Sequence, residues 1–449
     1  MNYRMERDTM GEMRVPADAL YGPQTQRAVE NFPISGLRLP RAFIRALGLI
    51  KACAAQVNGR LGSLKPEIAA AIERAALEVA EGKYDSQFVV DVFQTGSGTS
   101  TNMNVNEVIA HVTKTHPNDD VNQGQSSNDV IPTAMHIAAA QLTHERLLPA
   151  MGSLRTAFEA KAGAFHDVIK IGRTHLQDAV PMRLGQEFSG YEAQVRGSIE
   201  RVDTALNGIY ELPLGGTAVG TGLNAVPGFA EQTIRLISER TGLLFREARN
   251  HFEAQASKDA VVFLSAALRS YAVSLTKIAN DLRWLASGPR CGIGELKLPA
   301  TQPGSSIMPG KVNPVIAEST LMVCAQVVGY DATIAWCGAA GNFELNVMMP
   351  VMAYDLLQSI ELLAAGTQNL ETRLVAGLEA DRARAAALVE QSLAMVTVLA
   401  PVIGYDKAAE ISKEAYTKGR TIREVAREKS GLAEARLNEL LNPITQAGG

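Results

Sequence analysis

Apolar residues recur along most of the chain at the spacing of amphipathic helices. The longest pattern covers residues 253–287, which contain neither Gly nor Pro. Its large apolar side chains return at alternating steps of four and three residues: Leu264, Leu268, Tyr271, Leu275, Ile278, Leu282 and Leu285. This spacing predicts one helix about 50 Å long with a single apolar seam. Because sustained alternation of apolar and polar residues is scarce, we predict an all-α protein.

A helix of that length needs long neighbours to cover its seam, either from the same chain or from other subunits. We therefore expect self-association, with the seam from Leu264 to Leu285 buried between subunits. Four polar segments rich in Gly or Pro interrupt the helical pattern, at residues 95–106, 116–128, 172–186 and 303–314. Loops on a rigid scaffold are where chemistry is usually placed, so these segments are candidates for a site.

Composition narrows the choice of partner and compartment. The 449 residues are 46% hydrophobic with a net charge of −4, which excludes disorder as the main state and offers no basic surface for nucleic acid or an anionic membrane. The four cysteines lack the spacing of a disulfide framework or a zinc site. We find no signal-peptide pattern and no membrane-spanning apolar stretch. We therefore expect a cytoplasmic protein whose partner is a small molecule or another protein.

The segment 303–314, PGSSIMPGKVNP, combines three prolines and two glycines, so it predicts a constrained loop and not a helix. Its side chains would bring hydroxyl groups, the ammonium of Lys311 and the amide of Asn313 to one anion. The segment 95–106, TGSGTSTNMNVN, offers hydroxyls and amides, and Gly96 and Gly98 would let the backbone approach a ligand. A nucleotide phosphate loop is excluded because no GxxxxGK[ST] pattern is present. A capped loop in which Ser and Thr bond their own backbone is the alternative.

The remaining two segments add histidines and further donors. Residues 116–128 hold His116, two acids and the run Ser126, Ser127 and Asn128, but too few ligands for a convincing metal site. Residues 172–186 place His175 beside Thr174. The four segments thus supply hydroxyls, amides, the ammonium of Lys311 and the imidazole of His175. That set suits a dicarboxylate whose negative charge grows during the reaction, because such donors stabilise an oxyanion.

These strings resemble a known family. PGSSIMPGKVNP is similar to the signature of the aspartase/fumarase superfamily, and QTGSGTSTNMNVNEVIA, HPNDDVNQGQSSNDVIPTAMHIA and GNFELNV resemble class II fumarate hydratases. The resemblance extends over nearly the whole chain. It implies three mostly helical domains, which we place at residues 1–135, 136–395 and 396–449, with a central long-helix bundle at the core of a homotetramer. It also implies active sites shared between subunits, and no metal or organic cofactor.

The resemblance further implies the reversible hydration of fumarate to L-malate through an aci-carboxylate intermediate. Ser305 matches the base that takes a proton from the carbon next to a carboxylate, and His175 with Glu318 matches a pair that works through a bound water. The matched substrate contacts are Ser97, Thr99, Ser126, Ser127, Asn128, Thr174, Lys311 and Asn313. His116, Asn118 and Asp119 match a second, peripheral dicarboxylate site.

Departures from the family pattern define the alternatives. Leu176 stands where fumarases usually carry threonine and resembles aspartases, so aspartate ammonia-lyase is one alternative. His175, Ser127 and Gly310 favour a fumarase. A non-enzymatic, crystallin-like structural protein is an alternative of another class, which retention of Ser305 and Lys311 argues against. Asp120 replaces a usual histidine next to the peripheral site.

Overall fold

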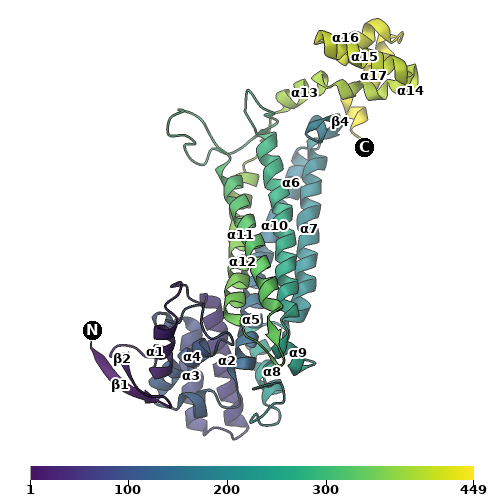
Figure 1. Ribbon diagram of the computed structural model, residues 1–449. Coiled ribbons are helices and arrows are strands. Elements are labelled where there is room, and N and C mark those ends of the chain that lie inside the picture. The colour runs from purple at the N-terminus through teal and green to yellow at the C-terminus, as the bar shows by residue number, and fades with distance from the viewer. Residues whose placement is uncertain (1, 449) are drawn as a thin grey trace. The chain divides into compact units, whose positions relative to one another are not determined.

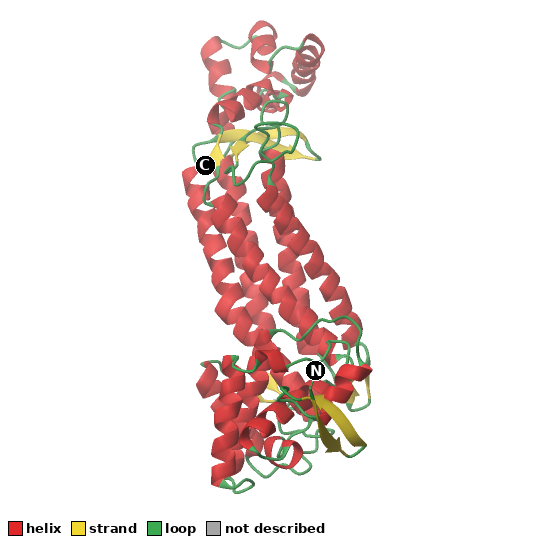
Figure 2. Ribbon diagram, turned by 90° about the vertical axis from the view of Figure 1, so that its left-hand side faces the viewer, coloured by secondary structure: helices red, strands yellow, loops and turns green. Residues whose placement is uncertain are grey.

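The computed structural model of the protein describes residues 2–448. Helices predominate in this part of the chain, as predicted (Figure 1), and its strands form only two-stranded sheets (Figure 2). The chain divides into two compact units. Unit 1 comprises Met1–Pro149, Ser198–Ala272 and Val323–Ala365, and unit 2 comprises Ala150–Gly197, Val273–Met322 and Gly366–Gly449. Three consecutive domains, at residues 1–135, 136–395 and 396–449, remain a prediction.

Unit 1 contains most of the N-terminal elements. They are β1 (Tyr3–Asp8), β2 (Gly11–Pro16), α1 (Pro23–Asn31), α2 (Arg41–Arg60), α3 (Pro66–Glu81), η1 (Asp85–Gln87), α4 (Thr99–Thr113), η2 (Pro117–Val121), α5 (Ser127–Leu142) and η3 (Thr143–Leu147), followed by β5 (Glu211–Leu212), α8 (Phe229–Thr241), β6 (Arg246–Glu247), α9 (His251–Ala256), β8 (Gly341–Asn342) and β9 (Leu345–Asn346). Long helices contribute residues to both units: α6 (Leu148–Ala164), α7 (Leu184–Ile209), α10 (Asp259–Leu285), α11 (Val315–Gly338) and α12 (Met349–Leu370).

Unit 2 adds a hairpin and the C-terminal helices. Its elements are β3 (Ile169–Thr174), β4 (Gln177–Arg183), β7 (Leu296–Lys297), η4 (Glu371–Val375), β10 (Glu379–Ala380), α13 (Arg382–Gln391), η5 (Leu393–Val398), α14 (Ala400–Ile403), α15 (Tyr405–Lys418), α16 (Ile422–Lys429), α17 (Glu434–Leu440) and α18 (Pro443–Gln446).

Helix α2 lies in the core of unit 1. Its sequence is apolar on most faces, and Phe43, Leu47 and Ile50 are completely buried. The helix packs against α3, α5 and α8, as expected for a helix with apolar residues all round. Lys51, in the middle of this apolar run, is also completely buried. A buried lysine needs polar partners, and these partners prove to lie close to the candidate site.

The predicted helix over residues 253–287 is two helices. Helix α9 ends at Ala256, where Ser257 adopts an extended conformation, and α10 begins at Asp259. The Nζ of Lys258 donates hydrogen bonds to the carbonyl oxygens of Ala254, Gln255 and Ser257 at 3.0, 2.7 and 2.7 Å. These bonds satisfy carbonyl groups at a helix end that no backbone N–H reaches. The prediction of one continuous helix is therefore wrong at this position.

The seam of α10 is covered within the chain itself. All seven seam residues from Leu264 to Leu285 are at most 4% exposed. The expectation that this seam is buried between subunits is wrong, because the chain itself already covers it. The exposed apolar side chains of α10 lie at other positions and include Phe263 at 54% and Val273 at 58%.

Helices α10 and α11 are long and apolar enough to span a membrane by length and composition. The core helices of proteins outside membranes pass the same test. In unit 1 the two helices are joined by polar contacts: Asp331 accepts a hydrogen bond from Ser265 at 2.7 Å and pairs with Arg269 at 3.0 Å.

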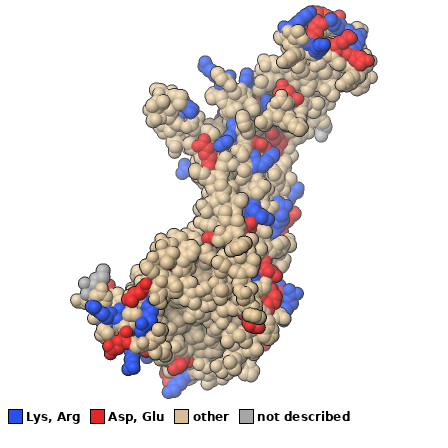
Figure 3. All heavy atoms as spheres, in the orientation of Figure 1, with Lys and Arg blue, Asp and Glu red and all other residues tan. Residues whose placement is uncertain are grey.

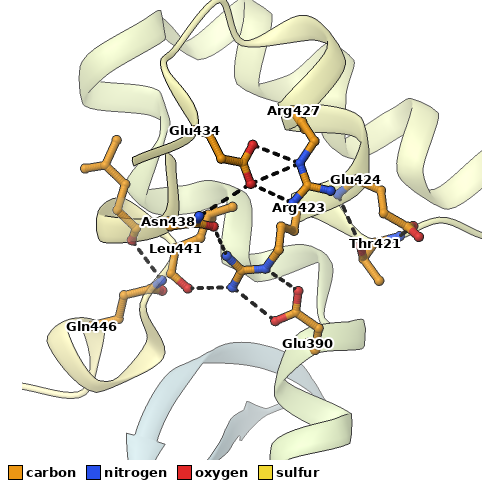
Figure 4. Close-up of polar contacts among 10 residues, drawn as sticks. Glu390, Thr421, Arg423, Glu424, Arg427, Glu434, Asn438, Leu441 and Gln446 are labelled. Atoms are coloured by element: carbon orange, nitrogen blue, oxygen red, sulfur yellow. Dashed lines mark hydrogen bonds and ion pairs between the residues drawn. The ribbon is translucent and has the colours of Figure 1, made fainter. Parts of the chain in front are cut away.

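The C-terminal helices of unit 2 have a small core and a polar network. Ile411, Val425 and Leu437 belong to one buried cluster. Beside it, Arg423 bridges Glu390 of α13 and the backbone carbonyl of Leu441 (Figure 4). The guanidinium group therefore ties α16 to α13 and to Leu441, the residue that follows α17.

Candidate active site

Ser97 and Thr99 lie where α4 begins. Gly98 precedes the first helical residue, and the Oγ of Ser97 lies 2.9 Å from the Oγ1 of Thr99. Ser97 is 8% exposed. The N-terminus of a helix presents free N–H groups and a partial positive charge, so these hydroxyls sit where an anion is favoured.

The two glycines of this loop are required by contacts within the chain. A Cβ at Gly96 would overlap the carbonyl oxygen of Val347, whose segment is tied to the loop by a bond from Met349 N to Gly96 O at 3.0 Å. Gly98 has φ +73°, and a Cβ there would lie 2.8 Å from Ile131. Close approach of a ligand, the reason expected from the sequence, is therefore not needed to explain either glycine.

Ser126, Ser127 and Asn128 form the start of α5. Ser126 is the N-cap residue, and with Asp129 it forms a capping box. In this box each side chain accepts a hydrogen bond from the backbone N–H of the other residue. Asp129 is completely buried and also accepts bonds from the backbone N–H of Gly215 and Thr217, each at 2.9 Å. Burial raises the pKa of Asp129, and these N–H donors oppose the rise. The turn is therefore held from several sides.

Sequence reasoning missed a polar network beneath this turn. The Oδ1 of Asn122 accepts bonds from Lys51 Nζ at 2.9 Å and from the Nδ2 atoms of Asn102 and Asn106, each at 3.1 Å. Asn102 Nδ2 also donates to Ser127 Oγ at 3.1 Å, which ties α4 to α5. One signal was available in the sequence: a single lysine within the apolar run of α2.

Thr174 and His175 lie at the tip of the β3–β4 hairpin. Thr174 pairs with Gln177, so His175 and Leu176 form a two-residue turn in which φ is +57° and +61°. Such turns favour Gly, Asn or Asp, and a leucine with positive φ is strained. Both residues are exposed. Strain of this kind concentrates at functional sites, which agrees with a role for His175.

The base of this turn is anchored by a buried ion pair that the sequence did not reveal. Arg173 donates to both carboxylate oxygens of Glu295, at 2.9 and 3.1 Å. Glu295 is completely buried and also lies 3.6 Å from Lys170 Nζ. A bidentate pair fixes orientation as well as distance, so it holds the strand that leads to His175.

The loop 303–314 in unit 2 is exposed and bonded mainly to itself. Gly304 N donates to Lys311 O at 2.9 Å, and Asn313 Nδ2 donates to Gly304 O. The Oγ of Ser305 accepts bonds from the backbone N–H of Met308 at 3.0 Å and of Ile307 at 3.3 Å. Two N–H donors aimed at this oxygen favour its deprotonated form.

Lys311 and Glu318 are available for other partners. Within residues 2–448, neither side chain makes a hydrogen bond or ion pair. Glu318 lies in the first turn of α11. His175 and Glu318 are not bonded to each other within the described chain, so their pairing remains a prediction.

The peripheral group lies at η2 in unit 1. His116 Nδ1 accepts a bond from Asp119 N at 3.0 Å, and Asp120 accepts one from His116 N at 2.7 Å. Asp120, the departure from the family pattern, thus closes the turn. His116 and Asn118 line a cavity of about 950 Å³ together with Lys114 and His111. Lys114, His111 and Asn118 offer donors to an anion, whereas the carboxylates of Glu6, Asp8 and Glu107 line the same cavity.

The predicted site residues fall into two sets. Ser97, Thr99, Ser126, Ser127 and Asn128 belong to unit 1, and Thr174, His175, Ser305, Lys311, Asn313 and Glu318 belong to unit 2. Across residues 2–448 no group of three or more His, Cys, Asp and Glu side chains is arranged to hold a metal ion.

Comparisons with known proteins agree on one family. A lyase family model matches residues 11–329, and a model of the fumarase C C-terminus matches residues 395–445. The chain is 55% identical to fumarate hydratase class II of Mycobacterium tuberculosis, over 97% of this chain and 93% of that protein. It is 54% identical to the enzyme of the same name from Halobacterium salinarum, over 98% and 96%.

Solved structures give the same answer. The crystal structure of recombinant class II fumarase from Schistosoma mansoni has a TM-score of 0.95 at 40% identity and covers 99% of both chains. A structure described as fumarate lyase:delta crystallin from Brucella melitensis bound to cobalt also has a TM-score of 0.95, at 46% identity, and covers 100% of both chains.

Proposed function

The chain belongs to the class II fumarate hydratase family of lyases, and from that premise we propose that it catalyses the reversible hydration of fumarate to L-malate. The observation that carries the mechanism is the pair of backbone N–H groups on Ser305 Oγ. Serine is a poor base for a carbon acid, and it becomes one only when its alkoxide is stabilised. The two N–H donors and the ammonium of Lys311 supply that stabilisation.

In the direction of dehydration, Ser305 takes the proton from the malate carbon next to a carboxylate. The electron pair of the broken C–H bond moves into that carboxylate, which becomes the dianionic aci-carboxylate. Lys311, Asn313 and the hydroxyls at the starts of α4 and α5 hold this charge. The C–O bond then breaks, and the hydroxyl leaves as water after taking up a proton at the end where His175 and Glu318 act through a bound water.

We propose that the protein is a homotetramer whose active sites combine residues of several subunits. Two observations support this assembly. In unit 1, Trp336 and Val328 of α11 are 76% and 42% exposed, an unusual exposure for large apolar residues. Figure 3 shows a broad tan surface, without Lys, Arg, Asp or Glu, in the middle of the lower half of the view. Light scattering should give about four times 48.0 kDa, and an active monomer contradicts the proposal.

A substrate panel tests the reaction itself. We expect purified protein to form fumarate from L-malate, followed by the absorbance of fumarate, and to form none from L-aspartate. Formation from L-aspartate alone would make the protein an ammonia-lyase. Absence of turnover with either compound in an intact tetramer would favour the crystallin-like role.

We also propose that the reaction needs no metal ion or organic cofactor, because neutral donors and Lys311 are sufficient to hold the dianion. Treatment with EDTA followed by gel filtration should leave kcat unchanged. Loss of activity that added divalent cation restores would contradict this prediction.

Two smaller proposals complete the picture. His116, Asn118 and Asp119 form a second dicarboxylate site, and His116→Ala should weaken binding there while leaving kcat near the wild-type value. The protein is cytoplasmic, which is supported by cysteines that are all free, since disulfides are rare in reducing compartments.

A further inference from the structure

We propose that Lys51, which touches no substrate, is a positioning residue that acts through Asn122 and Asn102 to hold the Ser127 hydroxyl as a donor to a substrate carboxylate. This inference rests on the proposed function, because it assigns Ser127 to the substrate. All the residues involved lie in unit 1.

The side chain of Lys51 ends at the segment that leads into α5. It is 0% exposed, and its Nζ donates to Asn122 Oδ1 at 2.9 Å and Gln125 Oε1 at 3.0 Å. Asn122 Nδ2 in turn donates to Gln125 O at 3.0 Å. Ser126 follows directly, so the ammonium group fixes the residues immediately before the substrate-binding turn. Removing the ammonium group would leave Gln125 Oε1 without this donor and would take one of three donors from Asn122 Oδ1.

Asn122 is the point at which these contacts converge. Its Oδ1 accepts three bonds, from Lys51, Asn102 and Asn106. The hydrogen bond from Lys51 is of the strongest type among the three, because its donor is charged. The orientation of the Asn122 amide, and with it the position of Asn102, therefore depends on Lys51.

The bond from Asn102 decides what Ser127 can do. Asn102 Nδ2 donates to Ser127 Oγ at 3.1 Å, so this oxygen accepts and its own proton is free for another partner. A carboxylate only accepts hydrogen bonds, and a hydroxyl that binds it has to donate. Before the substrate binds, the network therefore leaves the Ser127 hydroxyl free to donate its proton to a carboxylate.

The charge of Lys51 adds a pH dependence. Burial lowers the pKa of Lys51 to about 7, and the charge of Asp129 on α5 opposes that shift. The other nearby elements carry charges that are paired elsewhere: Glu73 of α3 with Arg240 of α8, Glu107 of α4 with the start of α1, and Asp119 and Asp120 of η2 with His116. A bound dianion favours the protonated lysine, so affinity should fall as pH rises through about 7.

The experiment compares two buried lysines of unit 1. Lys258 is 2% exposed, and burial also lowers its pKa to about 7, but its Nζ bonds only backbone carbonyls at the end of α9. Lys51→Met should raise KM for fumarate by about 10-fold or more, as expected for loss of a charged hydrogen bond. With succinate as a dicarboxylate inhibitor, inhibition of the wild-type protein should weaken as pH rises above about 7. Lys51→Met should abolish this weakening. Lys258→Met should keep both the wild-type KM and the wild-type pH profile.

A double-mutant cycle adds a second test. Asn102→Ala removes the bond to Ser127 directly and should raise KM on its own. Because Lys51 acts through Asn102, the two changes together should raise KM by less than the product of their separate effects. If Lys51→Met does not fold, as judged by circular dichroism, an unchanged KM in Asn102→Ala overturns the inference.

The outcomes separate this inference from the proposed function. Wild-type protein that does not hydrate fumarate refutes the function. Active wild-type protein with an unchanged KM and pH profile in folded Lys51→Met refutes only the role of Lys51. Equal effects of Lys51→Met and Lys258→Met also refute it, because they would show general damage to unit 1.

Discussion

The turn at the start of α5 and the loop 303–314, both of which we propose to contact the substrate, are held in opposite ways. Ser126 to Asn128 are held by a capping box, by Asp129 and by the network of Lys51. The loop is exposed, and the bonds that it makes are mostly within itself. Donors that stabilise developing charge work best when they are fixed in advance, whereas a segment that covers the substrate has to move. The contrast agrees with the proposal that the first region binds the substrate and that the second carries the base Ser305.

The β3–β4 turn combines features of both regions. Its tip, with His175, is exposed and strained, but its base is fixed by the bidentate pair of Arg173 and Glu295. A reactive imidazole has to reach the substrate while keeping one direction. If His175 acts as proposed, the Arg173–Glu295 pair fixes the direction of the hairpin and the exposed tip lets the imidazole reach the substrate.

The largest expected effect concerns the loop. Ser305→Ala removes the proposed base without removing a large contact, so kcat should fall by roughly 10²-fold or more while KM changes little. Thr301→Ala, which removes an exposed hydroxyl just before the loop, should retain wild-type kinetics. Steady-state rates with L-malate measure both. A near-normal kcat in folded Ser305→Ala protein would assign proton abstraction to another group and contradict the proposed role of the loop.

The hairpin tip should show the next largest effect. His175→Asn keeps a polar side chain in the strained turn but removes the imidazole, and kcat should fall by about 10²-fold, at the lower end of what a lost acid or base costs. Asparagine tolerates positive φ, so the turn itself should survive. Circular dichroism and light scattering check the fold and assembly. Wild-type turnover would make His175 a structural residue.

A binding residue on the loop should behave differently from Ser305. Lys311→Met removes a charge that we propose acts on the substrate both before and during the reaction. It should raise KM and lower kcat, with a total loss of about 1.5–3 kcal/mol in kcat/KM, the range for a hydrogen bond to a charged group. An effect confined to kcat would show that Lys311 acts only in the transition state.

The smallest expected effect is a difference in the free energy of unfolding between variants at the start of α5 and variants in the loop 303–314. Ser126→Ala removes the N-cap of α5 and should lower the free energy of unfolding by about 1 kcal/mol. Ser305→Ala should leave it nearly unchanged, because a loop bonded to itself contributes little to a helical core. Urea denaturation of both variants measures the difference. Equal losses would show that the loop is as firmly held as the start of α5.

Several features of this protein follow from the sequence alone. The spacing of apolar residues predicted the all-α class, and the strings around Ser305, Ser126 and Ser97 predicted the family that the comparisons confirmed. These features are local. Helical periodicity and motif chemistry depend on residues within a few positions of one another, and a single chain displays them directly.

Periodicity by itself was not sufficient for the long helices. The pattern over residues 253–287 continues through the break at Ser257, because apolar spacing does not report where carbonyl groups find other donors. The same pattern located the seam of α10 correctly but assigned its cover to other subunits. Which helices cover a seam depends on packing, and packing is not encoded in spacing.

Only the tertiary structure decided what holds the donors in place. Lys51 and Asn122 are 71 positions apart, and Arg173 and Glu295 are 122 apart, yet each pair is joined by hydrogen bonds of 2.9 Å. Nothing near Lys51 in the sequence identifies an amide partner. A buried charge is stable only with polar partners, and folding alone determines which residues of a distant segment provide them.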